Sequence, residues 1–147
     1  MDITVTAAYT DTVLEYCLRY SGSGKGGTAE VLSPPSVAGL VMEIREADGI
    51  LICDGMRLDT GIRGGPGITP VGICPVLWKL WTEGYGTQCR FETREGTETL
   101  ALQLEGDDGL LLESWFDRDT HLPIFCGVLQ DGVQVLTCSF SDAALIP

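Results

Sequence analysis

Two-residue turns made of an acidic residue and glycine restrict the fold of this chain more than any other feature. They occur at Asp48-Gly49, Asp54-Gly55, Glu95-Gly96 and Asp131-Gly132, between short segments in which apolar and polar residues alternate. Such pairs tolerate the left-handed backbone angles of a tight β-hairpin, and a period of two gives a strand one apolar and one wet face. The pattern therefore predicts successive antiparallel hairpins.

The alternating segments cover most of the chain. We expect strands around 3–9, 14–20, 28–33, 40–44, 50–53, 56–59, 89–93, 98–105, 110–116, 123–130 and 133–140. About ten strands exceed what a flat open sheet carries, so strong curling is expected. The predicted fold class is mainly β (α+β): a single curved antiparallel sheet that forms an open half-barrel.

The segment from Pro75 to Gly84 breaks the alternation and predicts a short helix. Proline suits a first helical turn and glycine suits the residue after the last turn. The large apolar side chains of this segment are Leu77, Trp78, Leu80 and Trp81. Their burial would contribute about 6 to 12 kcal/mol, more than the intrinsic propensity of so short a helix. We therefore expect the helix to pack on the concave face of the sheet.

Composition and charge limit the function. A chain of 147 residues, 44% hydrophobic and 20% charged, is expected to form a single soluble domain over residues 1–147. The net charge of −12 and the presence of only Lys25 and Lys79 as lysines exclude a nucleic-acid partner and simple electrostatic docking on anionic lipid. No apolar run approaches the roughly 20 residues of a membrane span, and if the protein is exported its leader is absent from this sequence.

Six cysteines are present, at positions Cys17, Cys53, Cys74, Cys89, Cys126 and Cys138. Their broad spacing and apolar surroundings favour small buried core residues, with one or more disulfides as the alternative. A metal site is disfavoured because no Cys-x-x-Cys pair occurs and the chain has a single histidine. We expect no metal and no cofactor.

Two stretches look like functional motifs but have simpler interpretations. The segment 22–28 is rich in glycine, but Arg19 occupies the place of the first glycine of a phosphate-binding loop and a strand follows where a helix is needed. Asp117, Asp119 and His121 favour a solvated turn over a cation site, and no nucleophile accompanies them. We therefore expect no catalytic residue and no enzyme activity.

The C-terminal segment from Trp115 to Asp142 carries the nearest thing to a family signature. It resembles the LolA-like superfamily of extracytoplasmic lipoprotein carriers in Phe116-Asp117, Thr120, Leu122-Pro123, the Asp131-Gly132 hairpin and Phe140, and in its order of strands, helix and further strands. The resemblance implies a curved half-barrel in an exported protein of the cell envelope, secreted or anchored as a lipoprotein, with an apolar cavity for acyl chains or a partner segment. The sequence departs from the pattern of the lipoprotein carriers in two places: we expect no helix before the first strand and no second lid helix after Thr60. Both departures weigh against lipoprotein shuttling.

The resulting hypothesis is a non-enzymatic extracytoplasmic binding protein whose apolar concave face holds a lipid, an acyl chain or an apolar segment of a protein partner. The residues expected to line that face are Leu14, Tyr16, Met42, Leu77, Trp78, Trp81, Leu100, Leu102, Phe116 and Phe140. Alternation does not separate a cavity from a filled core, so both interpretations of these residues remain open. The alternative function is a structural or protein-interaction module of a bacterial envelope or spore assembly, acting through a strand edge or the 61–70 loop.

Overall fold

The computed structural model describes residues 1–9, 11–23, 26–45, 48–53, 55–59, 69–107 and 109–144. These residues form one helix, α1 (Ile73–Glu83), and eleven strands: β1 (Asp2–Tyr9), β2 (Thr12–Ser23), β3 (Gly26–Ser33), β4 (Val41–Arg45), β5 (Asp48–Cys53), β6 (Met56–Asp59), β7 (Tyr85–Arg94), β8 (Thr97–Glu105), β9 (Leu110–Asp117), β10 (Pro123–Gln130) and β11 (Val133–Ser141). No helix in these ranges is long and apolar enough to cross a membrane.

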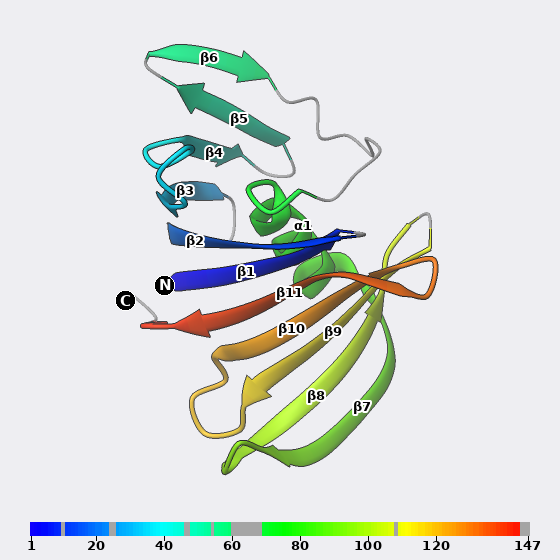
Figure 1. Ribbon diagram of the computed structural model, residues 1–147. Helices are drawn as coiled ribbons and strands as arrows, with labels where there is room; N and C mark the ends of the chain where they lie inside the picture. Colours follow the sequence, from blue (N-terminus) through cyan, green and yellow to red (C-terminus); the bar gives the residue numbers. More distant parts are fainter. Residues whose placement is uncertain are drawn as a thin grey trace.

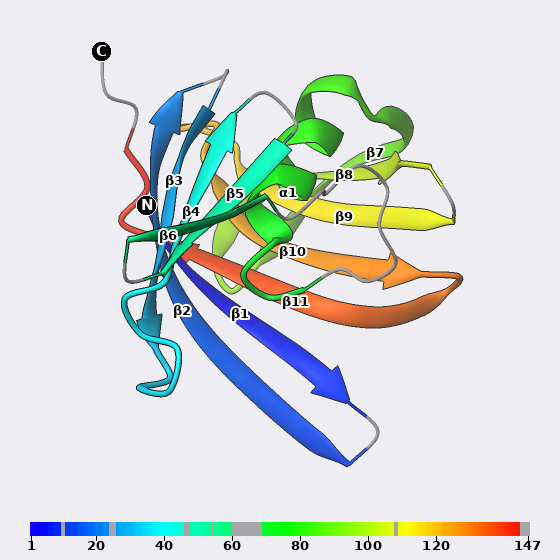
Figure 2. The ribbon, with the colours of Figure 1, turned by 90° about the horizontal axis from the view of Figure 1, so that it is seen from above.

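All strands belong to a single antiparallel sheet of order β6-β5-β4-β3-β2-β1-β11-β10-β9-β8-β7 (Figure 1). The sheet does not close on itself, because β6 and β7 stand at its two edges. It curves around α1, which lies on the concave face (Figure 2). The predicted open half-barrel with a short helix on its concave side is confirmed.

The first and last strands are neighbours at the middle of the sheet. Residues 2–7 of β1 pair with residues 136–141 of β11, whereas every other neighbouring pair is consecutive in the sequence. The sheet therefore has an N-terminal wing, β2 to β6, and a C-terminal wing, β7 to β10, joined along the β1–β11 ladder.

Two of the predicted hairpin turns have the expected geometry. Glu95 and Gly96 have φ angles of 50° and 83°, and Asp131 and Gly132 have φ angles of 51° and 81°. Left-handed angles at both central residues match the right-handed twist of the flanking strands. Gly55, also left-handed at 80°, follows this pattern, while its partner in the predicted turn, residue 54, lies outside the described residues.

The predicted Asp48-Gly49 turn is wrong. Both residues already belong to β5, where Asp48 pairs with Arg45 and Gly49 with Ile44. This register places Met42 opposite Leu51, so that two apolar side chains share the core face. A one-step change in strand register moves a whole apolar set to the wrong face, so core burial decides the register over local turn preference.

Gly22, Gly26 and Gly27 lie in strands, although so glycine-rich a segment favours a hairpin loop. β2 extends to Ser23 and β3 begins at Gly26, and Gly22 pairs with Gly27. A Cβ atom on Gly22 would lie 2.7 Å from Cα of Gly27 and 2.6 Å from the Tyr20 hydroxyl. Glycine is thus required here by the close approach of two strands. Lys25 and most of the 61–70 loop lie outside the described residues.

The helix begins two residues before the predicted position and ends where expected. The N–H of Gly72, just before α1, donates to Oγ1 of Thr69 (3.0 Å), and the N–H of Gly84, just after it, donates to the carbonyl of Leu80 (2.9 Å). Pro75 lies in the first turn, where a missing N–H costs nothing. The buried face of α1 consists of Ile73, Cys74, Pro75, Leu77 and Leu80.

The cysteines divide between core and surface, and all six are free thiols. Cys74, Cys126 and Cys138 are buried, as the sequence predicted for core residues. Cys126 and Cys138 are opposite partners on β10 and β11. Burial raises the pKa of the Cys74 thiol to about 12, and the neighbouring Cys138 thiol together with burial raises the pKa of Cys126. Cys89 is exposed.

One large aromatic side chain is buried on the convex face. Trp115 is 7% exposed, and it alternates with Ser114 and Phe116, which face α1. The ring of Phe125 lies 5.6 Å from that of Trp115, the Arg94 guanidinium lies over both rings at 4.6 and 4.1 Å, and the Trp115 indole N–H donates to Glu92. Aromatic packing and a cation over the rings cover Trp115 without help from the helix.

Candidate functional site

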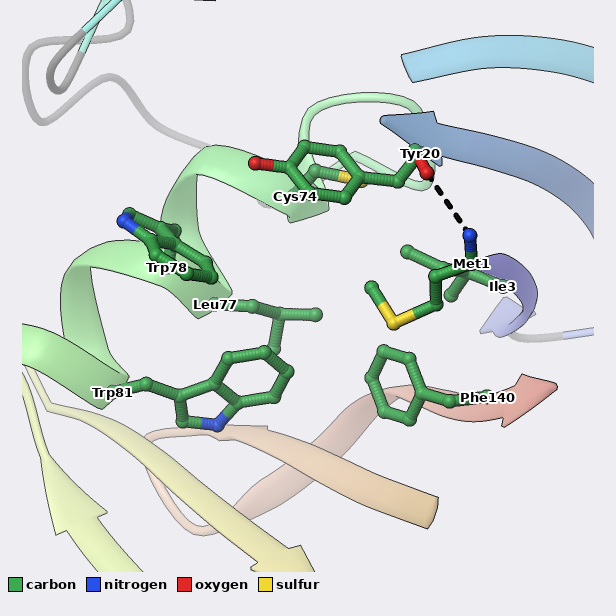
Figure 3. A pocket seen from close by; sticks show the side chains of 8 residues that line it. All are labelled: Met1, Ile3, Tyr20, Cys74, Leu77, Trp78, Trp81 and Phe140. Atoms are coloured by element: carbon green, nitrogen blue, oxygen red, sulfur yellow. Dashed lines mark hydrogen bonds between the residues drawn. The ribbon is translucent and has the colours of Figure 1, made fainter. Parts of the chain in front are cut away.

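The concave face beneath the helix is almost filled. Its remaining hollow has a volume of about 10 Å³, which admits about one water molecule. The hollow is lined by Met1, Ile3, Tyr20, Cys74, Leu77, Trp78, Trp81 and Phe140 (Figure 3). The terminal amino group of Met1 donates to the carbonyl of Tyr20 at 3.1 Å across its edge. This region is a packed core rather than a ligand cavity.

Trp81 connects the helix to the floor of the sheet. Its indole N–H donates to Oγ of Ser114 at 2.9 Å, and Ser114 is fully buried on β9. The Trp81 ring meets Phe116 edge-on at 5.6 Å and lies 5.7 Å from the ring of Phe140. The hydrogen bond and the two ring contacts fix both the depth and the orientation of α1.

The ten residues predicted for the concave face separate into groups. The structure gathers around α1 the residues Leu77, Trp78, Trp81, Phe116 and Phe140. Met42 is buried in the core of the N-terminal wing, and Tyr16 packs against that core. Leu100 and Leu102 are half-buried on β8. Leu14 has the right face but lies near the free end of the β1–β2 hairpin, where it is 39% exposed.

A larger hollow opens at the far end of the C-terminal wing. Its volume is about 300 Å³, and it is lined by Phe91, Leu100, Phe116, Asp117, Arg118 and His121. Phe91 pairs with Leu100, and Leu100 pairs with Phe116, so these apolar side chains form one row across β7, β8 and β9. Phe91 is 68% exposed. The sequence did not single out Phe91, although its place in the alternation of strand 89–93 could have indicated it.

The rim of this hollow is a hydrogen-bonded turn that follows β9. Oδ1 of Asp117 accepts the backbone N–H groups of Thr120 (2.7 Å) and Asp119 (2.9 Å), and these hydrogen bonds, first of all that from Thr120, lower the pKa of Asp117. The His121 N–H donates to the carbonyl of Asp117 at 2.9 Å, and the Arg118 N–H donates to that of Glu98 at 3.0 Å. The Arg118 guanidinium lies 5.3 Å from the centre of the Phe91 ring.

In the described part of the chain, the acidic side chains of this turn are not grouped as metal ligands would be. No group of three histidine, cysteine or acidic side chains with metal-binding geometry occurs there. The Asp117 carboxylate is used by the backbone of its own turn. The predicted turn is present, and the Asp117 carboxylate takes part in its hydrogen bonding.

Neither a protein-family model nor a curated protein matches the sequence. Solved structures do match. The chain aligns over 99% of its length with 86% of a LolA superfamily protein from Nitrosomonas europaea, at 13% identity and a TM-score of 0.51. It also aligns over 99% of its length with 70% of a domain described as outer membrane lipoprotein-sorting from Vibrio parahaemolyticus, at 14% identity and a TM-score of 0.59. The fold is LolA-like.

A third match with this LolA-like fold comes from the complex of the CwlD amidase of Clostridioides difficile with the GerS lipoprotein. It covers 99% of this chain and 85% of the matched chain, at 16% identity and a TM-score of 0.52. The expected resemblance is confirmed as a likeness of fold.

Proposed function

We propose that this protein is a non-enzymatic binding protein that takes a lipid-like ligand or an apolar partner segment on the open end of its concave face. The observation that carries the proposal is the row of Phe91, Leu100 and Phe116, which starts where Phe116 meets Trp81 of α1 and continues outward along an open hollow. Apolar side chains that line an open hollow are typical of a ligand site, and the outermost of them, Phe91, is 68% exposed. A hollow of about 300 Å³ is at the lower end of the range for small-molecule sites.

The similar structures support this proposal through what they are described to be. One is a LolA superfamily protein and another is described as lipoprotein-sorting. Both descriptions support a place outside the cytoplasm and a binding role in the cell envelope. The filled core below Trp78 and Trp81 moves the proposed site from the centre of the half-barrel to its C-terminal wing.

The test is binding of the uncharged apolar dye Nile red, followed by fluorescence titration. We expect the wild-type protein to bind the dye and Leu100→Asp to lose at least about tenfold in affinity, because a carboxylate would stand on the apolar floor. Val133→Asp is the matched control, since Val133 is an exposed apolar residue at the β10–β11 hairpin. Equal binding by Leu100→Asp and the wild type would contradict the proposed site.

A second candidate is recognition of a protein partner along edge strand β7. Nearly all of this ten-residue strand is exposed, and in the described part of the chain its outer edge has no neighbouring strand. Unpaired backbone groups along such an edge can bind an added strand. One of the similar structures is itself a complex between an amidase and a lipoprotein.

Proline substitutions distinguish this candidate from the first. Neighbouring N–H groups point to opposite sides of a strand, so one of Cys89→Pro and Arg90→Pro removes a donor from the open edge. The edge-strand candidate would be favoured if the wild type retained a partner protein that this single variant lost. Nile red binding of that variant should be unchanged. Loss of dye binding in both variants would instead indicate damage to the strand.

A further inference from the structure

We propose that the hollow on the C-terminal wing takes a single-chain amphiphile with an anionic headgroup, with Arg118 and His121 as the headgroup site. This inference rests on the proposed function and deepens it. The argument depends on how the floor, the rim and the charges of this one hollow are arranged.

The floor of the hollow suits an aliphatic chain. Phe91, Leu100 and Phe116 come from three adjacent strands and face the same side of the sheet. Phe116 also meets the ring of Trp81, so the row ends against the packed core and the hollow is closed at its inner end. A volume of about 300 Å³ favours one chain over a pair of chains.

The rim carries a guanidinium although the protein is strongly negative. The chain carries nine lysines and arginines against 21 acidic residues, and it has a single histidine. That histidine, His121, lines the hollow together with Arg118. Asp117 lines it too, but its carboxylate accepts hydrogen bonds from the backbone of the turn. The mouth of the hollow therefore presents the Arg118 guanidinium and the His121 imidazole above an apolar floor.

Arg118 differs from most other arginines of the described residues in having no carboxylate partner. The arginines held in ion pairs are Arg19, Arg45, Arg57 and Arg90. Arg118 instead lies against the Phe91 ring, which leaves its fork of N–H donors for a ligand. A guanidinium binds carboxylate or phosphate through two parallel hydrogen bonds.

The turn holds the backbone of Arg118 and of His121 in place. Backbone hydrogen bonds from Arg118 to Glu98 and from His121 to Asp117 fix both positions before any ligand arrives. A site whose residues are already held loses less entropy on binding. The sequence motif from Asp117 to Pro123 therefore has a role beyond turn formation.

The experiment is calorimetric titration with 1-decanol below its solubility limit, and with decanoate, decyl phosphate and decyltrimethylammonium, each below its critical micelle concentration. We expect one of the two anions to bind about tenfold more tightly than decanol, and the cation to bind most weakly. The anion that binds more tightly identifies the headgroup as carboxylate or phosphate. Inorganic phosphate that bound as tightly as decyl phosphate would overturn the assignment of an amphiphile.

Variants separate the headgroup site from the apolar floor. Arg118→Gln should lose about tenfold in affinity for the preferred anion and keep its affinity for decanol, at an unchanged unfolding midpoint. Arg57→Gln is the matched control on β6 and should change neither affinity. The headgroup site would be overturned if the wild type bound the anion and decanol with similar affinity. It would also be overturned if Arg118→Gln left the ratio of the anion affinity to the decanol affinity unchanged. Either result would leave the proposed function standing. Failure of the wild type to bind any of the probes would overturn both.

Discussion

Two parts of the same concave face have opposite characters. Beneath α1, side chains from the helix and the central strands leave a hollow of only about 10 Å³. On the C-terminal wing, three apolar residues of β7, β8 and β9 line an open hollow of about 300 Å³. Both parts lie on the apolar face of one sheet. The difference comes from a single helix of eleven residues, which is too short to cover the whole face.

The contrast shows that an apolar face becomes a core or a binding surface according to what covers it. Trp81 closes one part through its hydrogen bond to Ser114 and its ring contacts. Phe116 belongs to both parts, since it packs against Trp81 and lines the open hollow. Occupancy of the hollow is therefore expected to change the fluorescence of Trp81.

The strongest test of the contrast is the same substitution in both parts. Leu77→Asp should destabilise the protein by more than about 4 kcal/mol, because Leu77 is 2% exposed and the carboxylate would have no partner. Leu100→Asp should cost about 1 kcal/mol or less, because Leu100 is half-buried at the open hollow. Urea unfolding followed by circular dichroism gives both values. Equal losses would contradict the division of the face.

A second test concerns the attachment of the helix. Trp81→Ala should cost about 3 to 5 kcal/mol, from the lost ring contacts and the unpaired hydroxyl of Ser114. Trp81→Phe keeps a ring but not the indole N–H, so we expect a cost of about 1 to 2 kcal/mol. Guanidinium unfolding of the two variants separates packing from hydrogen bonding. A harmless Trp81→Ala would show that the helix is held elsewhere.

The third prediction uses the buried thiol of Cys74, which lines the filled part. Its pKa is raised from 9.0 to about 12, so the folded state keeps a proton that the unfolded state releases. The stabilisation that this raised pKa represents is complete below pH 9 and is lost as the pH rises from 9 to 12. At pH 10 the loss should be about 1 kcal/mol.

The comparison that isolates this effect is between the wild type and Cys74→Ala. The free energy of unfolding is measured in urea at pH 8 and at pH 10. Between these two pH values it should fall less for Cys74→Ala than for the wild type. Titrating groups away from this site affect both proteins alike and cancel in the difference, which then reports Cys74 together with its effect on the pKa values of Tyr20 and Cys126. An identical fall in both proteins would mean that water reaches the thiol.

The smallest effect is expected at the exposed end of the apolar row. Phe91→Ala should change the free energy of unfolding by no more than about 0.5 kcal/mol, since the side chain is 68% exposed. The same variant should weaken Nile red binding, because Phe91 forms part of the floor. Thermal unfolding beside the dye titration checks both expectations. A large loss of stability with unchanged binding would assign Phe91 to the core.

Local signals predicted the strands, the helix and the turns at Glu95-Gly96 and Asp131-Gly132 because their causes are local. An acidic residue before glycine supplies the left-handed angles, and a wide apolar surface after Pro75 supplies the helix. Asp48-Gly49 has the same local chemistry but does not form the turn. The register that pairs Met42 with Leu51 places Asp48 and Gly49 in β5. That residues 1–147 form one domain stays a prediction.

Longer-range features were beyond the reach of alternation. A shift in register between Pro123 and Phe125 brings Phe125 opposite Trp115, whereas an unshifted ladder would have placed it opposite Ser114 on the concave face. The alternation of apolar and polar residues does not indicate such a shift. The cluster of Trp115, Phe125 and Arg94 on the convex face was therefore not expected. Alternation likewise placed Leu100 and Phe116 on the concave face of the sheet. It did not predict how much of that face the helix covers.

The ladder between β1 and β11 has a consequence for how this chain acquires its structure. Residues 2–7 pair with residues 136–141, so one side of β1 has no neighbour in the sheet until synthesis has passed β11. Contacts so distant in sequence slow folding, and an open strand in an incomplete sheet invites wrong pairings with other chains. β11 therefore joins the two wings of the sheet, and until it is in place the open side of β1 is exposed to wrong pairings.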